Sequence, residues 1–178
     1  DPSLRSDVWE IRILESETGN PRRESRRAKI QPHVYLPTHD ISIYIDSSLE
    51  LKYHNVRKMV DIAMEGDDAA IYPHYKRDCV YEEIEHVAND NDRSVPKSEC
   101  KQAIRKYEEL GYPRKAGLFE NAFIFRRNTP QVQKMNEIWW QEYVAGSERD
   151  QFTLMYAIHK SKVKVNSISV GKQFRVNP

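Results

Sequence analysis

Short apolar runs alternate along the chain with longer segments of helical periodicity, and this alternation constrains the fold most strongly. Strands of alternating or continuous apolar residues are predicted at 8–14, 41–46, 69–72, 123–126 and 163–170. Helices are predicted at 22–31, 55–65, 80–87, 98–110, 129–143 and 147–159. The polar stretch 15–20 is predicted to be a loop. Gly111 is predicted to end the helix 98–110. Strands separated by helices favour a layered α/β fold.

Length and composition limit the class of protein. A chain of 178 residues is long enough for one domain with a sizeable core, so we expect a single domain over 1–178. Because the chain begins at Asp1 without a methionine, we expect it to be processed or excised from a longer protein. Charged residues make up 31% and hydrophobic residues 39%, as in globular proteins. The net charge of +1 argues against broad binding to a nucleic-acid backbone.

Two further features bear on the compartment. No apolar run approaches the roughly 20 residues that a membrane-spanning helix needs, and no signal peptide is visible. Cys79 and Cys100 are the only cysteines. They could pair, but without a secretory signal we expect free thiols in a reducing compartment, the cytoplasm.

An acidic residue follows the predicted strand 41–46. Ser42, Tyr44 and Asp46 fall on one face of this strand, and Ile43 and Ile45 fall on the other. Open α/β sheets bind ligands at the carboxyl ends of their strands, where a carboxylate can hold a divalent cation and, through it, a nucleotide diphosphate. The alternative is a strand whose final Asp caps the following turn.

Basic side chains are concentrated just before this strand. They are Arg22, Arg23, Arg26, Arg27 and Lys29, followed by His33. On a helix Arg22, Arg26 and Lys29 share one face, and arginine donates paired hydrogen bonds to phosphate oxygens. This helix is therefore predicted to bind an anion, although a solvated basic face or a nucleic-acid contact would explain the pattern as well.

A loop that carries His74, Arg77 and Asp78 follows the predicted strand 69–72. Loops at strand ends are common places for ligand contacts. Glu82 and Glu83 come next and point in different directions on a helix, so at most one of them can share a site with His74. A surface network of ion pairs is the alternative explanation.

Two weaker clusters complete the set. Glu120 and Asn121 follow Gly117 directly before the strand 123–126, where they could bind hydroxyl groups, although the cluster alone favours an ordinary loop. Ser147 is predicted to cap the helix over 147–159, with Asp150 completing the capping arrangement. Trp139 and Trp140 cannot both face the core of one helix, so one of them is expected near a cleft.

In order, these clusters read R-R-x-x-R-R-x-K-x-x-P-H, S-I-Y-I-D-S-S-L-E-L, H-x-x-R-D-C-x-Y-E-E, G-L-F-E-N, W-W-x-E-Y and R-D-Q. This order resembles a family of glycosyltransferase-like domains with the GT-A fold, long catalogued as a domain of unknown function, with plant, bacterial and large algal-virus members. The resemblance runs from about residue 9 to residue 159. No single motif is specific, but six in the same order are.

The resemblance implies a GT-A-like mixed β-sheet flanked by α-helices. It also implies a metal-dependent transfer of sugar from a nucleotide-sugar, with a UDP-linked hexose expected, to a glycan acceptor. The strand, loop and helix that cradle the base at the start of GT-A domains have no counterpart in the sequence. We therefore expect this first element to be absent or to come from another segment.

Individual residues take their expected roles from the resemblance. Asp46 is expected to hold Mn²⁺ or Mg²⁺ as the remaining acid of a D-x-D-like motif, with Ser48 at the second position. The expected phosphate-binding residues are Arg26, Arg27 and Lys29. The expected catalytic residues are Asp150 and Glu120, and the expected sugar- or acceptor-binding residues are His74, Arg77, Asn121, Gln151 and Trp140.

Other readings stay open at this point. Ser48 in place of a second acid is compatible with a nucleotide-sugar or carbohydrate-binding domain without catalysis. A metal-dependent nuclease or phosphotransferase that uses Asp46, Glu82 and Asp150 is a third candidate, against which the low net charge argues. Relatives with a D-Q motif favour retention of configuration over inversion slightly.

Overall fold

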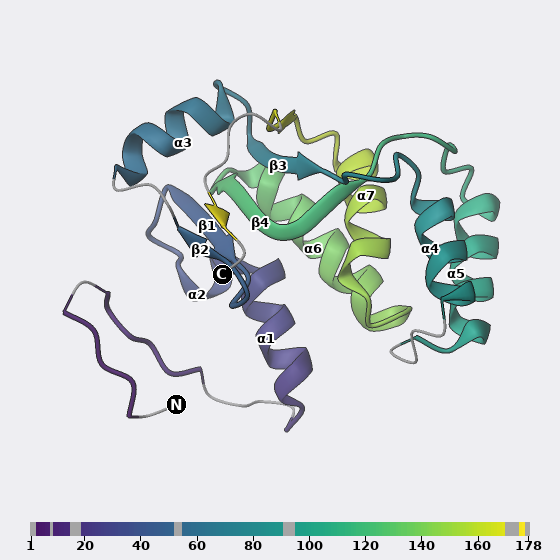
Figure 1. Cartoon of the computed structure of the whole chain (residues 1–178), viewed down its shortest axis with the longest axis horizontal. Coiled ribbons are helices and arrows are strands. Elements are labelled where there is room, and N and C mark those ends of the chain that lie inside the picture. Colours follow the sequence, from purple (N-terminus) through teal and green to yellow (C-terminus); the bar gives the residue numbers. More distant parts are fainter. Residues whose placement is uncertain are drawn as a thin grey trace.

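A mixed β-sheet lies at the centre of the molecule (Figure 1). The computed structural model describes residues 3–7, 9–14, 19–51, 55–90, 95–169 and 175–176. The sheet contains, in spatial order, β1 (Ile41–Ile45), β4 (Phe119–Arg127), β3 (Ala69–Pro73) and β5 (Val165–Ser167). Strand β4 is antiparallel to both of its neighbours, and β3 and β5 are parallel. A separate antiparallel pair joins β2 (Glu50–Leu51) to β6 (Arg175–Val176).

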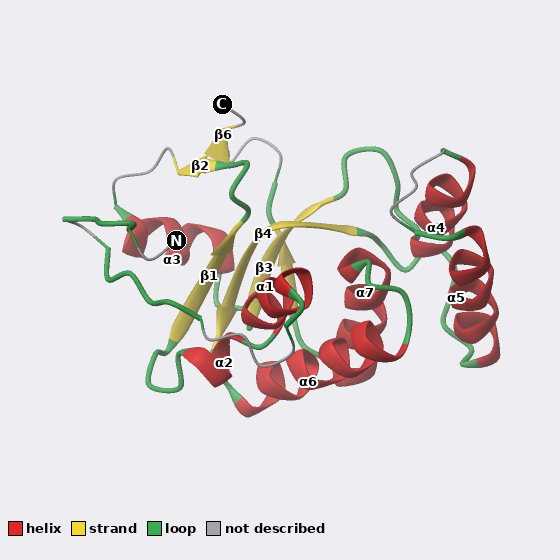
Figure 2. Cartoon of the chain, turned by 90° about the horizontal axis from the view of Figure 1, so that it is seen from below, coloured by secondary structure: helices red, strands yellow, loops and turns green. Residues whose placement is uncertain are grey.

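Helices cover both faces of the sheet (Figure 2). Seven are described: α1 (Pro21–Ile30), α2 (Pro32–Tyr35), α3 (Val56–Met64), α4 (Val80–Asn89), α5 (Lys97–Glu109), α6 (Pro130–Ala145) and α7 (Asp150–Ser161). Buried side chains of α6, α7 and the end of α1 pack on one face, and α3 packs on the other. Helices α4 and α5 pack together against α7 and extend the core beyond the sheet. The fold is therefore a single-domain α/β fold with a flanked mixed sheet, consistent with a GT-A-like architecture.

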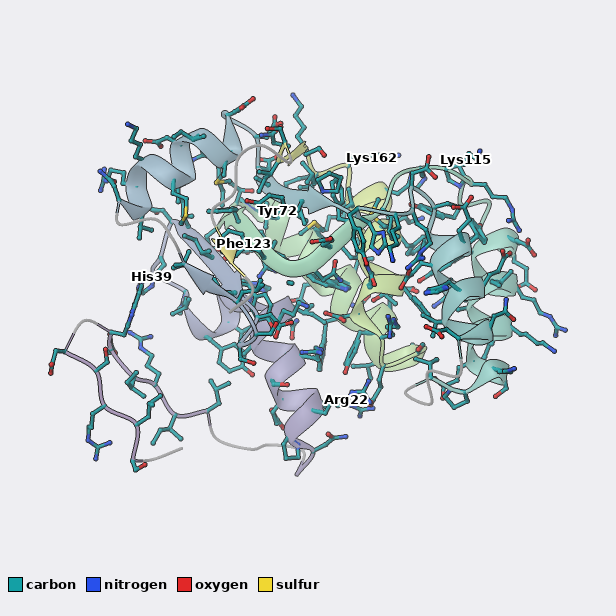
Figure 3. The ribbon with its side chains drawn as sticks, viewed as in Figure 1. Arg22, His39, Tyr72, Lys115, Phe123 and Lys162 are labelled. Atoms are coloured by element: carbon teal, nitrogen blue, oxygen red, sulfur yellow. The ribbon has the colours of Figure 1, made fainter. Side chains whose placement is uncertain are left out.

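Alternation along the strands produces these two cores. On β4, Phe123 and Phe125 face the α3 side, whereas Ile124 faces the α6 side. The rings of Phe123 and Tyr72 of β3 stack with their centroids 6.1 Å apart (Figure 3). This is the period-two pattern that a sheet buried on both faces requires.

Helix ends are fixed by local residues. The Asn20 side chain accepts a hydrogen bond from the Arg23 amide at the start of α1, and Pro21 occupies the first turn, where its missing N–H costs nothing. Gly111 follows α5 with a φ of +65°, a conformation that favours glycine. The prediction that Gly111 ends this helix is confirmed.

The sequence predicts most of these elements, with boundaries that differ by a few residues. Four elements depart more. The predicted strand over 8–14 is wrong, because residues 9–14 form no strand and pair with no neighbour, and Trp9 and Ile13 are 62% and 63% exposed. Helix α2 and the pair formed by β2 and β6 were not predicted. Val8, residues 15–18 and Val170 lie outside the described residues.

The predicted cap of α7 is also wrong. The helix begins at Asp150 with Arg149 in the capping position, and no side chain there makes a capping hydrogen bond. The Ser147 hydroxyl is buried and has no hydrogen-bond partner among the described residues. Within the described part of the chain, no helix is both long and apolar enough to cross a bilayer.

Candidate functional site

One pocket is lined by residues from each of the sequence clusters predicted to bind a ligand. It has a volume of about 360 Å³ and lies where the carboxyl ends of β1 and β3 meet the start of β4. Its lining residues are Arg22, Arg26, Lys29, Asp46, His74, Glu120, Asn121, Ala122, Glu148, Arg149, Asp150 and Gln151. Another cavity, of about 260 Å³, lies between α5 and α6 and is lined by none of the predicted site residues. The first pocket is therefore the candidate site.

Helix α1 presents its basic face to this pocket. Arg22, Arg26 and Lys29 all line it, as the helical spacing predicts. Arg27, predicted as a phosphate ligand, does not line the pocket. His33 instead lies in α2, where its ring nitrogen is 2.9 Å from a carboxylate oxygen of Glu137 on α6.

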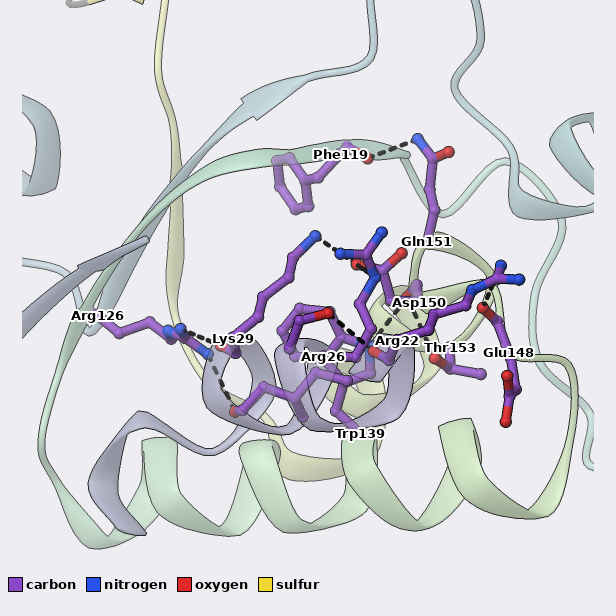
Figure 4. A network of polar contacts seen from close by, with 12 residues as sticks. Arg22, Arg26, Lys29, Phe119, Arg126, Trp139, Glu148, Asp150, Gln151 and Thr153 are labelled. Carbon is purple, nitrogen blue, oxygen red and sulfur yellow. Dashed lines mark hydrogen bonds and ion pairs between the residues drawn. The ribbon is translucent and has the colours of Figure 1, made fainter. Parts of the chain in front are cut away.

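Lys29 and Asp150 form the central ion pair of the pocket (Figure 4). The Lys29 side chain is only 3% exposed, and its ammonium group also lies 4.7 Å from the centre of the Tyr44 ring. Burial lowers the pKa of Lys29, and the negative charge of Asp150 opposes this effect. Arg26 is a more distant partner of Asp150, with 3.9 Å between its Nε and the Asp150 Oδ2.

Asp46 follows β1 and lines the pocket at the strand end, where the sequence predicts it. Its backbone amide donates to the Ala122 carbonyl, which holds it against β4. Burial raises the pKa of Tyr44 to about 12, and the negative charge of the Asp46 carboxylate adds to this rise. Ser48 does not line the pocket.

The residues fit a metal ion only in a restricted sense. No group of three or more His, Cys, Asp or Glu side chains in the described ranges is arranged to hold one. Asp46 thus offers a single carboxylate, and the nearby carboxylate of Asp150 is already paired with Lys29. Magnesium is commonly held by one or two carboxylates together with substrate phosphates. The pocket therefore suits a cation that arrives with a diphosphate rather than a resident metal centre.

The start of β4 contributes two polar side chains. Glu120 and Asn121 line the pocket. Asn121 is only 7% exposed, and neither its amide oxygen nor its amide nitrogen has a hydrogen-bond partner among the described residues. A buried amide without hydrogen-bond partners is costly in free energy. A polar ligand that hydrogen-bonds to the Asn121 amide would remove this cost.

A buried carboxylate lies close to two residues of the pocket lining. Glu83 of α4 is 2% exposed and accepts hydrogen bonds from Arg77 at 2.6 Å and from Arg149 at 3.3 Å. The His74 Nε2 lies 3.9 Å from the same carboxylate. His74 and Arg149 line the pocket, whereas Arg77 does not. Of the two acids predicted as alternatives, Glu83 is the one near His74, because Glu82 is exposed.

The remaining predicted residues divide between the pocket and its surroundings. Gln151 lines the pocket and donates to the Phe119 carbonyl at 3.1 Å. Trp140 does not line it, and its ring stacks on Tyr143 with centroids 5.6 Å apart. Glu148 and Arg149, next to the predicted Asp150, line the pocket but were not predicted to bind a ligand. Their place between W-W-x-E-Y and Asp150 was the available signal.

This pocket combines a cationic helix face, a strand-end carboxylate and hydroxyl-binding groups, a set suited to a phosphorylated sugar compound. The model of the TOD1/MUCI70 glycosyltransferase-like domain matches residues 3–175. The chain belongs to the TOD1/MUCI70 family of glycosyltransferase-like domains. Searches of curated proteins and of solved structures find no significant match. Family membership supports a glycosyltransferase-like role with sugar donor and acceptor partners for this TOD1/MUCI70 domain.

Proposed function

We propose that this domain transfers a sugar from a nucleotide-sugar, with a UDP-linked hexose as the expected donor, to a hydroxyl group of a glycan acceptor. The observation that carries the proposal is that α1 cations, the strand-end Asp46 and the buried Asn121 line one pocket. Phosphates, a cation and sugar hydroxyls are the ligands that these three kinds of group bind.

The donor diphosphate would lie against α1. Arg22, Arg26 and Lys29 offer positive charge on one helix face, and stabilising the leaving diphosphate addresses the largest charge that develops during glycosyl transfer. We propose that Asp46 holds Mn²⁺ or Mg²⁺ jointly with diphosphate oxygens. When bound, such an ion would neutralise part of the leaving-group charge.

The reacting sugar would lie between Asp150 and Glu120. In an inverting reaction, Asp150 takes the proton of the acceptor hydroxyl. The oxygen of that hydroxyl bonds to the anomeric carbon while the bond from this carbon to the diphosphate breaks. In a retaining reaction, which we favour slightly, Asp150 or Glu120 stabilises the positive charge on the sugar. Asn121, Gln151 and His74 would bind hydroxyl groups of the donor sugar or the acceptor.

The charged groups of the pocket also support a second candidate function, nucleotide-sugar binding without catalysis. The Asp150 carboxylate is paired with Lys29, and Asp46 belongs to no group of three or more potential metal-ligating side chains among the described residues, features compatible with nucleotide-sugar binding without turnover. The nuclease or phosphotransferase hypothesis is less well supported. Glu82 does not line the pocket, so Asp46, Glu82 and Asp150 do not form one cluster.

Calorimetric titration tests the proposal. A panel of nucleotide-sugars is titrated into the protein with Mn²⁺ and with a chelator, on the wild type, Asp46→Ala and Asp40→Ala. Asp40 is an exposed acid at the other end of β1 and serves as the matched control. Metal-dependent binding that is lost only in Asp46→Ala supports the donor site, and detection of a glycosylated acceptor separates transfer from binding. A folded wild-type protein that binds no nucleotide-sugar would overturn the proposal.

We also propose a cytoplasmic location. Cys79 and Cys100 are both buried, and neither forms a disulfide bond, a state typical of a reducing compartment. Fractionation of the source cells, with thiol labelling of the denatured protein, tests this part of the proposal.

A further inference from the structure

Two buried side chains lie next to the residues of the Lys29–Asp150 ion pair, and neither of them lines the pocket (Figure 4). Arg126 of β4 is 1% exposed, and Trp139 of α6 is fully buried. Both carry N–H donors that reach backbone carbonyls of the two paired residues. The ion pair is therefore held at its backbone as well as through its side chains.

Arg126 holds the last turn of α1. Its Nη2 donates to the Lys29 carbonyl at 2.6 Å, and its Nη1 donates to the Ile30 carbonyl at 3.2 Å and to the Asn136 Oδ1 at 3.1 Å. The last carbonyls of a helix lack partners within the helix, and a cation there interacts favourably with the helix dipole. Burial lowers the pKa of Arg126. Burying a charged guanidinium costs free energy, and Arg126 has no ion pair among the described residues. Its hydrogen bonds to the last carbonyls of α1 explain why it is buried there.

Trp139 holds the first residue of α7. Its indole Nε1 donates to the Asp150 carbonyl at 2.9 Å, which ties α6 to the start of α7. The Thr153 hydroxyl donates to the same carbonyl at 3.2 Å, but this bond stays within α7. The Arg126 guanidinium carbon lies 6.0 Å from the centre of the Trp139 ring, within the range of a cation–π interaction.

We propose that Arg126 and Trp139 are positioning residues of the candidate site. They fix the backbones of Lys29 and Asp150 so that the ammonium and carboxylate groups meet at the pocket wall. The consequence for the donor rests on the proposed function, since Lys29 is a proposed phosphate ligand and Asp150 a proposed catalytic group. The effect on the ion pair itself does not depend on that function.

A double-mutant cycle tests the positioning role without any ligand. Lys29→Met, Asp150→Asn and the double variant give the coupling between the two residues as a factor in the unfolding equilibrium constant. We expect this factor to fall at least fivefold when the cycle is repeated with Trp139→Phe, which keeps the aromatic ring and removes the donor. Arg126→Lys keeps the positive charge but lacks the planar guanidinium that donates to both carbonyls. This variant is also expected to lower the coupling factor.

Two matched controls decide whether position or general destabilisation is responsible. Thr153→Val removes the other donor to the Asp150 carbonyl, whose hydrogen bond stays within α7 and does not connect it to α6. Arg127→Lys changes the arginine next to Arg126, which donates to the Asp67 carbonyl instead. Both are expected to leave the coupling factor within twofold of the wild-type value. An unchanged factor in Trp139→Phe, or an equal fall in Thr153→Val, overturns the proposal. Trp139→Phe decides alone if Arg126→Lys does not fold.

UDP binding separates this inference from the proposed function. If the wild type binds UDP, we expect Trp139→Phe to weaken binding at least fivefold. Ile84→Val, a core substitution on α4 at a residue that does not line the pocket, is expected to leave binding unchanged despite a loss of stability. Equal effects of the two variants on UDP affinity would overturn the positioning role. If the wild type does not bind UDP, the expectation of a UDP-linked donor fails, and the double-mutant cycle still decides on the two positioning residues.

Discussion

The ammonium group of Lys29 and the carboxylate of Asp150 meet in the pocket from two helices that are more than a hundred residues apart in sequence. Lys29 is almost fully buried, and the Asp150 side chain is 12% exposed. Removing one member of a buried pair leaves an uncompensated charge, which is much more costly than removing both. This relationship leads to the first prediction.

Lys29→Met is expected to lower the free energy of unfolding by about 3–5 kcal/mol, because Asp150 loses its main partner. The double variant Lys29→Met/Asp150→Asn is expected to be more stable than Lys29→Met, since its carboxylate is gone as well. Urea denaturation of the three proteins measures this difference. Arg26→Met is the control, since Arg26 is a distant and more exposed partner of Asp150. A double variant less stable than Lys29→Met would contradict the prediction.

Glu83→Gln is expected to destabilise the protein by about 3–5 kcal/mol, because the variant leaves Arg77 and Arg149 without their shared buried carboxylate. Glu82→Gln, the exposed neighbour on the same helix, is expected to change stability by less than about 0.5 kcal/mol. Thermal and urea unfolding compare the two variants. Similar unfolding midpoints for both would show that the Glu83 contacts contribute little.

The sequence predicts the parts of the site that depend on local periodicity. The spacing of Arg22, Arg26 and Lys29 places them on one helix face, and all three line the pocket. The alternation around β1 brings Asp46 to the strand end at the same edge of the sheet. In both cases one element and its geometry determine the position of the side chain.

Other parts depend on contacts between distant elements. Helical spacing shows that Trp139 and Trp140 diverge, but it does not identify the one that faces the core, because that depends on the docking of α6. Arg126 did leave a signal, since it shares a face with the buried Ile124 on β4, where a charge requires a partner. Residues 9–14 of the alternating run have no neighbouring strand in the described part of the chain, and alternation alone does not form a strand.

His74 is expected to make the protein less stable in mild acid. Burial lowers the pKa of His74 from its ordinary value of 6.5, although Glu83 opposes this effect. The His74 Nδ1 accepts bonds from the backbone amides of Lys76 and Arg77, and protonation at this nitrogen would break both. Because the unfolded chain takes up the proton more readily, stability falls as the pH decreases below 6.5 toward the folded-state pKa.

The unfolding free energy measured between pH 7.5 and pH 5 checks this expectation. His74→Gln is expected to show a smaller decrease over this range than the wild type. His86→Gln, a change at an exposed histidine of α4, keeps His74 and should therefore keep its contribution. An identical decrease in the wild type and His74→Gln would rule out His74 as a source of acid sensitivity.

Asn121→Leu is expected to stabilise the protein and to weaken sugar binding at the same time. The substitution removes two buried polar atoms that have no partner among the described residues, a gain of about 1 kcal/mol or more in unfolding free energy. If the Asn121 amide binds a sugar hydroxyl, the affinity for a UDP-sugar falls about tenfold, whereas the affinity for UDP changes little. Differential scanning calorimetry and titration with both ligands measure the two effects. A loss of stability would mean that the amide already has a structural role, and equal weakening of UDP and UDP-sugar would place Asn121 away from the sugar.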